Sequence, residues 1–559
     1  MLSALFMCAA ALLAVRLYFV QIVHGEDYQK SARGQYVETS SERQGRGDIF
    51  FSKKEGDLVA AAVMQSGWGL AIVPAEITDP EKVFEMLSSI VPLDKERFFA
   101  SAAKVGDPYE DVGFRLGDSA ATRIRKEKIP GVILAPDQWR SYPGDVLAAH
   151  AIGFVGYKGD TKVGVYGLEA RYEDSLVKTS SLYVNPFAEI FANVGAALSS
   201  DPVENKGSVI TSIEPQVQAR LEETLSGVLK TYSPRSAAGI VMDPRTGEII
   251  AMAIRPTFDP NTYNTVDDPS VFTNILVENV YEMGSIMKPL TVAAGIDVGA
   301  ITPKTTYNDK GCIEKSGKKI CNYDGKARGV VSMQEVLNQS LNLGASFVAD
   351  TMGHNVFSEY IHAFGLGEKT GVDLPNEARG IIYAIDRGYD VDYASASFGQ
   401  GIAMTSIETI RALASLANGG VLPPPHVVKG IKLESGIVRD IIPPQGPRVL
   451  KIETVQTVSD MLVKVFDKAL LGGILKQEHY SIAAKTGTAQ IAIPGGGGYY
   501  EDRFLHSFFG YFPAHDPKFI VFLVAIEPHG AEFASATLAR PFLDIAKYLI
   551  NYYDIPPDR

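Results

Sequence analysis

Ser285 and Lys288, three residues apart, are the residues of this sequence whose spacing most directly indicates chemistry. Residues i and i+3 share one face of a helix, so the Ser285 hydroxyl can approach the Lys288 amine within hydrogen-bond reach. Gly284 permits a tight turn just before them. If the helix starts near Ile286, Pro289 occupies its fourth position, where the missing N–H costs little. The pattern predicts a serine nucleophile beside its own base.

The lysine can act as that base only if its pKa is lowered, because an ordinary lysine has a pKa of about 10.4. Burial and a second cation would lower the pKa of Lys288, and Lys485 is the candidate for that cation. The positive end of the helix dipole would also favour an oxyanion beside Ser285. Taken alone, the pair fits an N-cap serine and a solvated lysine better than a catalytic pair.

Ser340 and Asn342 form a second polar motif, with one residue between them. At that spacing both side chains face one cleft only from a turn, not from a regular helix. From a turn, Ser340 can relay a proton and Asn342 can hydrogen-bond a substrate amide. By itself the motif fits a capping segment for the following helical run better.

The third motif is Lys485-Thr486-Gly487-Thr488, in a stretch of small and β-branched residues that predicts a strand. Gly487 removes a side chain where a ligand must approach the backbone closely. The threonine hydroxyls and the lysine can then bind a carboxylate. A plain edge strand with a solvated lysine is the alternative for this segment alone. The order and spacing of all three motifs predict a penicillin-recognising serine acyl transferase.

Together the motifs resemble those of class B penicillin-binding proteins, the monofunctional peptidoglycan transpeptidases of cell division and elongation. The resemblance covers nearly the whole chain, and its further matches are residues 238–252, 256–261, 364–367, 370–375, 397–401 and 164–169, with Arg43, Arg46, Gly47 and Ile49. Two departures exist. Met283 stands where the family often has proline, and Phe51-Ser52 replaces an Asp-Arg pair after the amino-terminal signature.

The resemblance implies roles for the motif residues: Ser285 as acylated nucleophile, Lys288 as general base, Ser340 as proton shuttle, Asn342 as ligand of the substrate amide, and Lys485, Thr486, Gly487 and Thr488 as the carboxylate-binding strand, whose lysine also tunes Lys288. The backbone N–H groups of Ser285 and Thr488 would form the oxyanion hole. The implied reaction has two steps. Ser285 attacks the D-alanyl-D-alanine bond of a stem peptide, releases D-alanine, and passes the acyl group to the amine of another stem. β-Lactams would mimic the dipeptide and trap Ser285.

The partners that the resemblance implies are peptidoglycan stem peptides, glycan strands from a lipid-linked precursor, β-lactams, a polytopic membrane glycosyltransferase and other divisome or elongasome proteins. A membrane-anchored β-lactam sensor and a catalytically idle scaffold of the wall-synthesis complex are the alternatives. A sensor should carry a sizeable cytoplasmic or multi-span module, and this sequence shows neither. Septal and side-wall roles both fit the sequence.

Length and composition agree with a multi-domain enzyme attached to the cell membrane, and the resemblance implies that its catalytic region lies outside that membrane. The 559 residues, 46% of them hydrophobic, suffice for two or more domains, and a net charge of -12 argues against nucleic-acid binding. Residues 2–15 carry no charge, and the apolar character resumes after Arg16 through Val23. Because a bilayer span needs roughly 20 residues, we expect an uncleaved signal anchor with Arg16 near one interface. A cleaved signal peptide is the alternative.

Cys312 and Cys321 flank a segment that can turn at Ser316-Gly317, and an extracytoplasmic location would permit a disulfide between them. Two free thiols are the alternative. The nine histidines form no recognisable ligand cluster, so we expect neither a catalytic metal nor another cofactor.

Pattern shifts divide the chain near residues 24 and 206. The resemblance implies that these parts are an anchor at residues 1–24, an elongated, strand-rich pedestal or dimerisation-type domain at 25–206 with a helix near 80–88, and a transpeptidase domain at 207–559. The elements expected in the last region are helices over residues 216–225 and 542–553 and strands over 239–242, 248–254, 508–512 and 519–526. Consecutive hairpins imply an antiparallel sheet with helices on its faces, an α+β transpeptidase fold. A glycine-rich loop at 495–498 either gates the cleft or is an idle surface loop.

Overall fold

The computed structural model describes residues 45–159, 161–177 and 206–559. The anchor expected at residues 1–24 and the family residue Arg43 lie outside these ranges. Within them, no helix has the length and apolarity that crossing a membrane requires. The chain divides into two compact units, and the larger one includes Asp48–Val63 and Ser141–Leu176 as well as Asn205–Arg559.

The smaller unit packs helices against the second half of a long strand, β2 (Leu58–Ile72), which pairs with β3 (Glu110–Leu116) and β4 (Val132–Ser141). Its other elements are η2 (Pro74–Glu76), α3 (Pro80–Ser88), α4 (Lys95–Ala102) and α5 (Asp118–Glu127). Leu70, Leu87 and Phe98 lie fully buried in its core. Asp79 caps α3 by accepting the N–H of Lys82. The helix predicted near residues 80–88 is confirmed.

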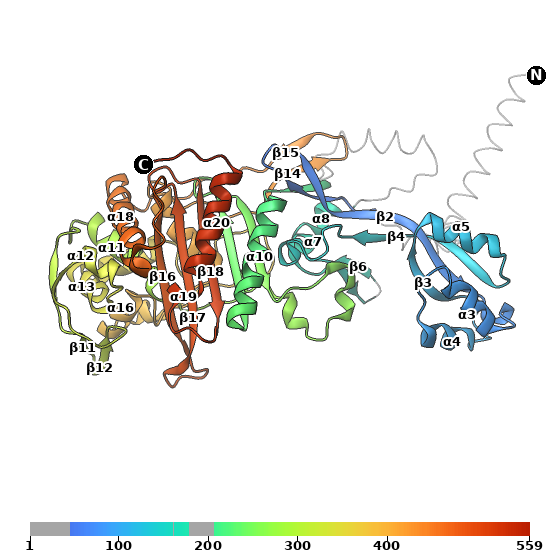
Figure 1. Cartoon of the computed structure of the whole chain (residues 1–559), viewed down its shortest axis with the longest axis horizontal. Coiled ribbons are helices and arrows are strands. Elements are labelled where there is room, and N and C mark those ends of the chain that lie inside the picture. Colours follow the sequence, from blue (N-terminus) through green and yellow to red (C-terminus); the bar gives the residue numbers. More distant parts are fainter. Residues whose placement is uncertain (1–44, 160, 178–205) are drawn as a thin grey trace, which may run out of the picture. The chain divides into compact units, whose positions relative to one another are not determined.

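The larger unit is built on a five-stranded antiparallel sheet, which Figure 1 shows in the left half of the picture. Its strands, in spatial order, are β16 (Ala483–Ala492), β17 (Tyr499–Phe512), β18 (Phe519–Ile526), β8 (Ser236–Met242) and β9 (Ile249–Arg255). Both predicted hairpins are present, although β17 begins at Tyr499 rather than near residue 508. The pairing of β18 with β8 joins the two hairpins into one sheet and leaves β16 at an edge.

Helices cover both faces of this sheet. On one face lie α10 (Pro215–Tyr232) and α20 (Ala539–Tyr552), where the Phe508 and Phe542 rings are 4.6 Å apart. On the other face lie α11 (Lys288–Asp297) and α18 (Ile452–Lys464), and Ser459 Oγ of α18 is 2.8 Å from the Tyr511 hydroxyl. The predicted α+β architecture is therefore confirmed, and the two predicted helices are α10 and α20.

A second sheet joins segments from opposite ends of the larger unit. Its strands, in order, are β15 (Val438–Asp440), β14 (Val428–Leu433), β7 (Gly207–Thr211), β1 (Ile49–Ser52) and the first half of β2. Because β1 pairs in parallel with β7, residues near 50 become part of the unit that begins again near 205.

The remaining helices and short strands surround these sheets. They are α6 (Ala149–Ile152), β5 (Val155–Lys158), β6 (Thr161–Gly164), α7 (Gly167–Arg171), α8 (Glu173–Leu176), η4 (Pro260–Thr265), η5 (Pro269–Phe272), η6 (Gly284–Met287), β10 (Thr306–Asp309), β11 (Cys312–Lys315), β12 (Lys318–Cys321), β13 (Gly329–Ser332), α12 (Met333–Asn338), α13 (Asn342–Met352), α14 (His354–Ala363), α15 (Tyr383–Arg387), α16 (Asp390–Ala396), α17 (Ser406–Ala414), η7 (Ser415–Ala417), η8 (Val465–Ala469), η9 (Leu470–Gly473) and α19 (Ala534–Thr537).

Candidate active site

Ser285 lies in a tight first turn that precedes the α-helix. The 3-10 helix η6 begins at Gly284, two residues before the predicted helix start, and α11 continues it from Lys288. Gly284 has a φ of 64°, and its N–H donates to the backbone oxygen of Gly399 at 3.0 Å. Pro289 is consequently the second residue of α11, where its missing N–H is also harmless. The turn places the serine at the amino end of the helix.

Lys288 has no exposed surface, and its Nζ lies 2.8 Å from Ser285 Oγ. The same amine donates to the Ser340 backbone oxygen at 2.5 Å and lies 3.2 Å from Ser340 Oγ. All three partners are uncharged oxygen atoms. Burial, followed by the positive charge of Lys485, lowers the pKa of Lys288 well below its ordinary value. A neutral Lys288 keeps a lone pair that can accept the Ser285 proton.

Lys485 also contacts the Ser340 hydroxyl. It is 2% exposed, and its Nζ donates to Ser340 Oγ at 2.9 Å and to the Thr486 backbone oxygen at 2.9 Å. Burial lowers the pKa of Lys485 to about 7. The Ser340 hydroxyl therefore lies between two buried amines, and it can pass a proton from one to the other.

The second motif adopts the turn that its one-residue spacing predicts. Ser340 lies between α12 and α13 with a φ of 56°, a left-handed conformation that few residues other than glycine adopt. Asn342 is the first residue of α13, and its Nδ2 donates to the Cys321 backbone oxygen at 2.9 Å. The turn directs the Ser340 hydroxyl at both lysines while the hairpin that contains Cys321 holds the asparagine.

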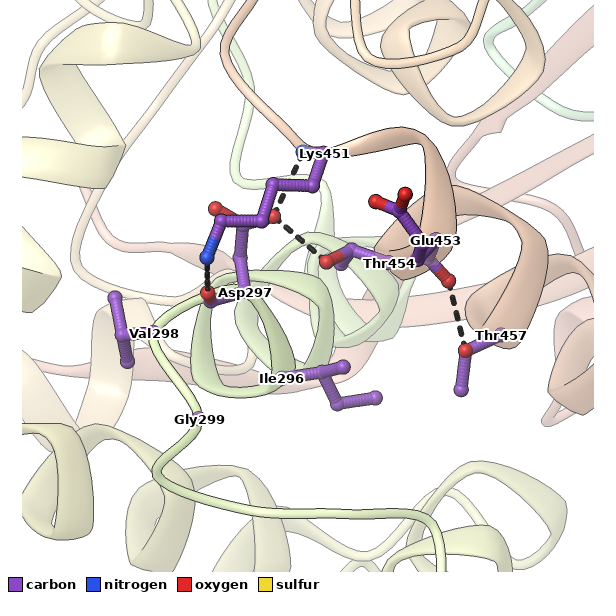
Figure 2. A pocket seen from close by; sticks show the side chains of 8 residues that line it. All are labelled: Ile296, Asp297, Val298, Gly299, Lys451, Glu453, Thr454 and Thr457. Atoms are coloured by element: carbon purple, nitrogen blue, oxygen red, sulfur yellow. Dashed lines mark hydrogen bonds between the residues drawn. The ribbon is translucent and has the colours of Figure 1, made fainter.

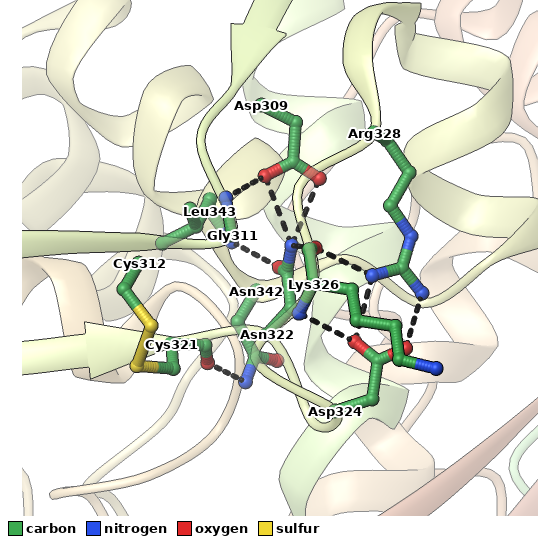
Figure 3. The surroundings of a disulfide bond; sticks show 10 residues. All are labelled: Asp309, Gly311, Cys312, Cys321, Asn322, Asp324, Lys326, Arg328, Asn342 and Leu343. Atoms are coloured by element: carbon green, nitrogen blue, oxygen red, sulfur yellow. Dashed lines mark hydrogen bonds and ion pairs between the residues drawn. A yellow bond between two sulfur atoms is a disulfide. The ribbon is translucent and has the colours of Figure 1, made fainter.

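That hairpin is closed by a disulfide between Cys312 and Cys321. Its strands β11 and β12 turn at Ser316 and Gly317, which have φ values of 47° and 71°, so the predicted turn is confirmed. Figure 3 shows how the next residue, Asn322, continues this arrangement. Its Oδ1 accepts the N–H of Leu343 at 3.2 Å, and its Nδ2 donates to both carboxylate oxygens of Asp309. The cross-linked hairpin thus fixes the first turn of α13.

The third motif lies on β16 and contacts the serine turn through backbone atoms. A Cβ built on Gly487 would lie 2.6 Å from the Met283 backbone oxygen and closer still to Ser507 Oγ. Ser507, directly opposite Gly487 on β17, donates to the Met283 oxygen at 2.9 Å. The motifs did not indicate Ser507. The sequence feature that could have identified it is a small polar residue within a buried, mostly apolar strand. Glycine here lets the strand touch the turn that carries Ser285.

Thr488 makes a contact on the other side of the same strand. Its Oγ1 accepts the N–H of Ala534, the first residue of α19, at 3.1 Å. Because this bond uses the threonine oxygen as an acceptor, the hydroxyl hydrogen of Thr488 stays available as a donor. Thr486 is half-buried, and its backbone oxygen accepts from Lys485.

Glu282, a carboxylic acid outside the three motifs, ties the β16–β17 hairpin to the serine turn. The Tyr499 hydroxyl donates to Glu282 Oε2 at 2.9 Å and lies 3.2 Å from Oε1. Burial raises the pKa of Glu282 to about 7. Tyr499 directly follows the glycine-rich loop at 495–498, so this contact fixes one end of that loop.

A pocket of about 350 Å³ lies elsewhere, between the end of α11 and the start of α18. Figure 2 shows Asp297, Lys451 and Thr454 at its centre. The Asp297 carboxylate accepts the Lys451 N–H at 2.8 Å and the Thr454 hydroxyl at 2.7 Å, and the Lys451 amine donates to the Asp297 backbone oxygen. These groups satisfy one another and join two helix ends. Among the residues that the structure describes, no group of three His, Cys, Asp or Glu side chains is arranged to hold a metal ion.

Comparisons with known proteins find similar sequences and structures over most of the chain. Residues 237–547 match the penicillin binding protein transpeptidase domain, and residues 42–183 match the penicillin-binding protein dimerisation domain. Stage V sporulation protein D of Bacillus subtilis is 28% identical over 536 residues, or 94% of this chain and 81% of the relative. The probable peptidoglycan D,D-transpeptidase PenA of Neisseria meningitidis serogroup A is 25% identical over 100% of this chain and 93% of its own. A crystal structure of penicillin binding protein 3 from Mycobacterium tuberculosis matches with a TM-score of 0.65 and 27% identity, over 76% of this chain and 92% of that one.

Proposed function

Since this chain belongs to the class B penicillin-binding proteins, we propose that Ser285 is the residue acylated in its transpeptidase reaction. The protein is a peptidoglycan D,D-transpeptidase of cell-wall synthesis and a target of β-lactams. The observation that supports Ser285 is its Oγ at 2.8 Å from a buried lysine whose partners are all uncharged. The proposal assigns the remaining chemistry to the groups around this pair.

In the first step, Ser285 Oγ attacks the carbonyl carbon of the D-alanyl-D-alanine peptide bond and gives its proton to the neutral Lys288. The carbon–nitrogen bond then breaks. The leaving D-alanine nitrogen takes a proton from the Ser340 hydroxyl, which recovers one from a neighbouring lysine amine at 2.9 Å or 3.2 Å. The products are free D-alanine and an ester between the stem peptide and Ser285.

In the second step, the amine of another stem peptide attacks this ester. The amine gives up a proton through Ser340 and the lysines, a new peptide bond forms, and the carbon–oxygen bond to Ser285 breaks. Ser285 Oγ regains its proton from Lys288. A β-lactam follows the first step, but its ring-opened amine stays attached and the ester persists.

The substrate is held from two sides in this proposal. Asn342, fixed through its Nδ2 to the cross-linked hairpin, offers its Oδ1 to a substrate amide N–H. Thr486 and Thr488 donate their hydroxyls to the terminal carboxylate, with Lys485 as the nearby cation. The backbone N–H groups of Ser285 and Thr488 would receive the oxyanion, since the Thr488 backbone lies beside Gly284.

Covalent labelling with fluorescent penicillin tests the assignment. We expect the full-length protein and its Ser435→Ala variant to give a covalent band, because Ser435 is exposed in the turn between β14 and β15. The Ser285→Ala variant should give none, with an unchanged melting temperature. Equal labelling of Ser285→Ala would refute the nucleophile, and absence of labelling in all three would favour the idle scaffold.

We also propose that residues 1–24 anchor the protein as a single span and that the catalytic unit works outside the cell membrane. The substrate class supports this location, because peptidoglycan lies there. A polytopic membrane glycosyltransferase is the proposed partner, bound through the anchor and the pedestal. Co-purification with such a partner should be lost when residues 25–205 are deleted, and intact co-purification would refute docking through the pedestal.

A further inference from the structure

His506 is a fully buried histidine that neither the sequence motifs nor the proposed reaction uses. It lies on β17 directly opposite Thr488 of β16, and residues directly opposite in an antiparallel pair project from the same face of the sheet. α19 packs against both strands, where Ala534 donates to Thr488 Oγ1 and the Thr537 hydroxyl lies 2.9 Å from His506 Nδ1. The histidine is therefore the cross-strand neighbour of a proposed substrate-binding threonine.

Both ring nitrogens of His506 hold the segment 532–537. Nε2 lies 3.2 Å from the Glu532 backbone oxygen, which only accepts, so Nε2 carries the hydrogen. Nδ1 then accepts from the Thr537 hydroxyl at 2.9 Å, a shorter contact than the 3.3 Å between the same hydroxyl and the Ala534 backbone oxygen. Burial lowers the pKa of His506 to about 4, which keeps the ring in this neutral form. One side chain thus ties down the two ends of the segment.

The middle of the segment makes two contacts near the active site, one through Ala534 and one through Phe533. Ala534 donates its N–H to Thr488 Oγ1 at 3.1 Å, as described above. The neighbouring Phe533 is 39% exposed, and its ring lies edge-on to that of Tyr323, with centroids 5.7 Å apart. Tyr323 belongs to the loop that follows the disulfide-linked hairpin. Movement of this segment would change both the Thr488 hydroxyl and the aromatic contact beside the second motif.

We infer that His506 is a positioning residue for the substrate carboxylate, acting through residues 532–537 on the hydroxyl of Thr488. With Ala534 held in place, the Thr488 oxygen accepts its N–H and the threonine hydrogen points away to a substrate carboxylate. Without the histidine, the segment loses these two tethers and keeps the hydrogen bond from the Tyr232 hydroxyl to the Ala536 oxygen, so Ala534 and the Thr488 hydroxyl are held less firmly. The inference rests on the proposed function, since it takes Thr488 to bind the substrate carboxylate.

A double-mutant cycle on penicillin acylation tests the inference in the full-length protein. The variants are His506→Leu, Thr488→Val and the two combined, with Thr537→Val as an independent break of the same tether. We expect His506→Leu to weaken non-covalent penicillin binding about tenfold, the effect of one lost hydrogen bond to a charged group, while the acylation rate constant of the bound complex changes little. Combining it with Thr488→Val should add almost nothing, because both changes remove the same interaction.

Matched controls separate positioning from general destabilisation. His515→Leu removes a half-exposed histidine and should leave binding unchanged. His506→Gln, whose amide can again donate to the Glu532 oxygen, should restore part of the lost binding. If His506→Leu unfolds, Thr537→Val carries the same cycle. Multiplicative effects with Thr488→Val would overturn the inference, and so would unchanged binding in both His506→Leu and Thr537→Val. The proposed function would stand in either case while Ser285 remains the labelled residue.

Discussion

Replacing Gly487 by alanine should separate the third motif from the serine turn. The added Cβ would lie 2.6 Å from the Met283 backbone oxygen and 3.1 Å from Ile286 Cγ2, in addition to its overlap with Ser507. Ordinary contact requires the strand and the turn to part by roughly 1 Å, because the Met283 oxygen belongs to a backbone that cannot rotate away. A displacement of this size between reacting groups costs about 10²-fold in rate.

The assay is the second-order rate constant for acylation by fluorescent penicillin, with melting temperature measured in parallel. We expect the loss in rate to exceed any effect of folding, since overpacking costs about 1–3 kcal/mol. Gly497→Ala is the matched control, because a Cβ there meets open space and that loop residue has an ordinary φ. Adding Ser507→Ala should not restore the rate, because the Met283 oxygen still blocks the Cβ. Acylation of Gly487→Ala within about threefold of the unchanged protein would refute this reasoning.

Three further results are expected. Acylation should rise with pH as Lys288 loses its proton and fall above about pH 7 as Lys485 loses its charge, and a flat profile would contradict the two roles. Replacing Cys312 and Cys321 by serine should lower the free energy of unfolding by about 2–3 kcal/mol, since the bond joins residues 9 apart. A melting temperature equal to that of the oxidised, unchanged protein would refute this. Asp558→Ala should lower the free energy of unfolding in urea by about 1–3 kcal/mol, because the Asp558 carboxylate accepts from Ser481, which leads into β16. An unchanged urea midpoint would argue against this tether.

The sequence predicted two features of the site whose spacing is local. The contact of Ser285 with Lys288 follows from helix geometry over three residues, and the Ser340 turn follows from a single intervening residue. The two hairpin patterns also predicted the antiparallel sheet. In each case the information lies within a few neighbouring residues, where steric rules leave little choice.

Contacts that depend on strand register or on distant segments could not be predicted in this way. Ser507 meets the serine turn only because β17 pairs with β16 in one particular register. Glu282 and Tyr499 are 217 residues apart, and neither has a motif of its own. The parallel pairing of β1 with β7 likewise joins segments about 160 residues apart. Such contacts are decided by the packing of the whole unit, which a local pattern does not contain.

In the proposed mechanism, the two buried lysines together determine where protons move. Two ammonium groups around one serine hydroxyl would repel each other in a site from which water is excluded, and burial alone already disfavours both charges. When Lys288 takes the Ser285 proton, the added charge is relieved if a proton leaves by way of Ser340 to the departing amine. The hydroxyl lies 3.2 Å from one amine and 2.9 Å from the other, so this transfer needs no movement of either lysine. The Ser340 turn therefore places the hydroxyl through which the leaving group receives its proton, and this transfer removes the added positive charge from the buried site.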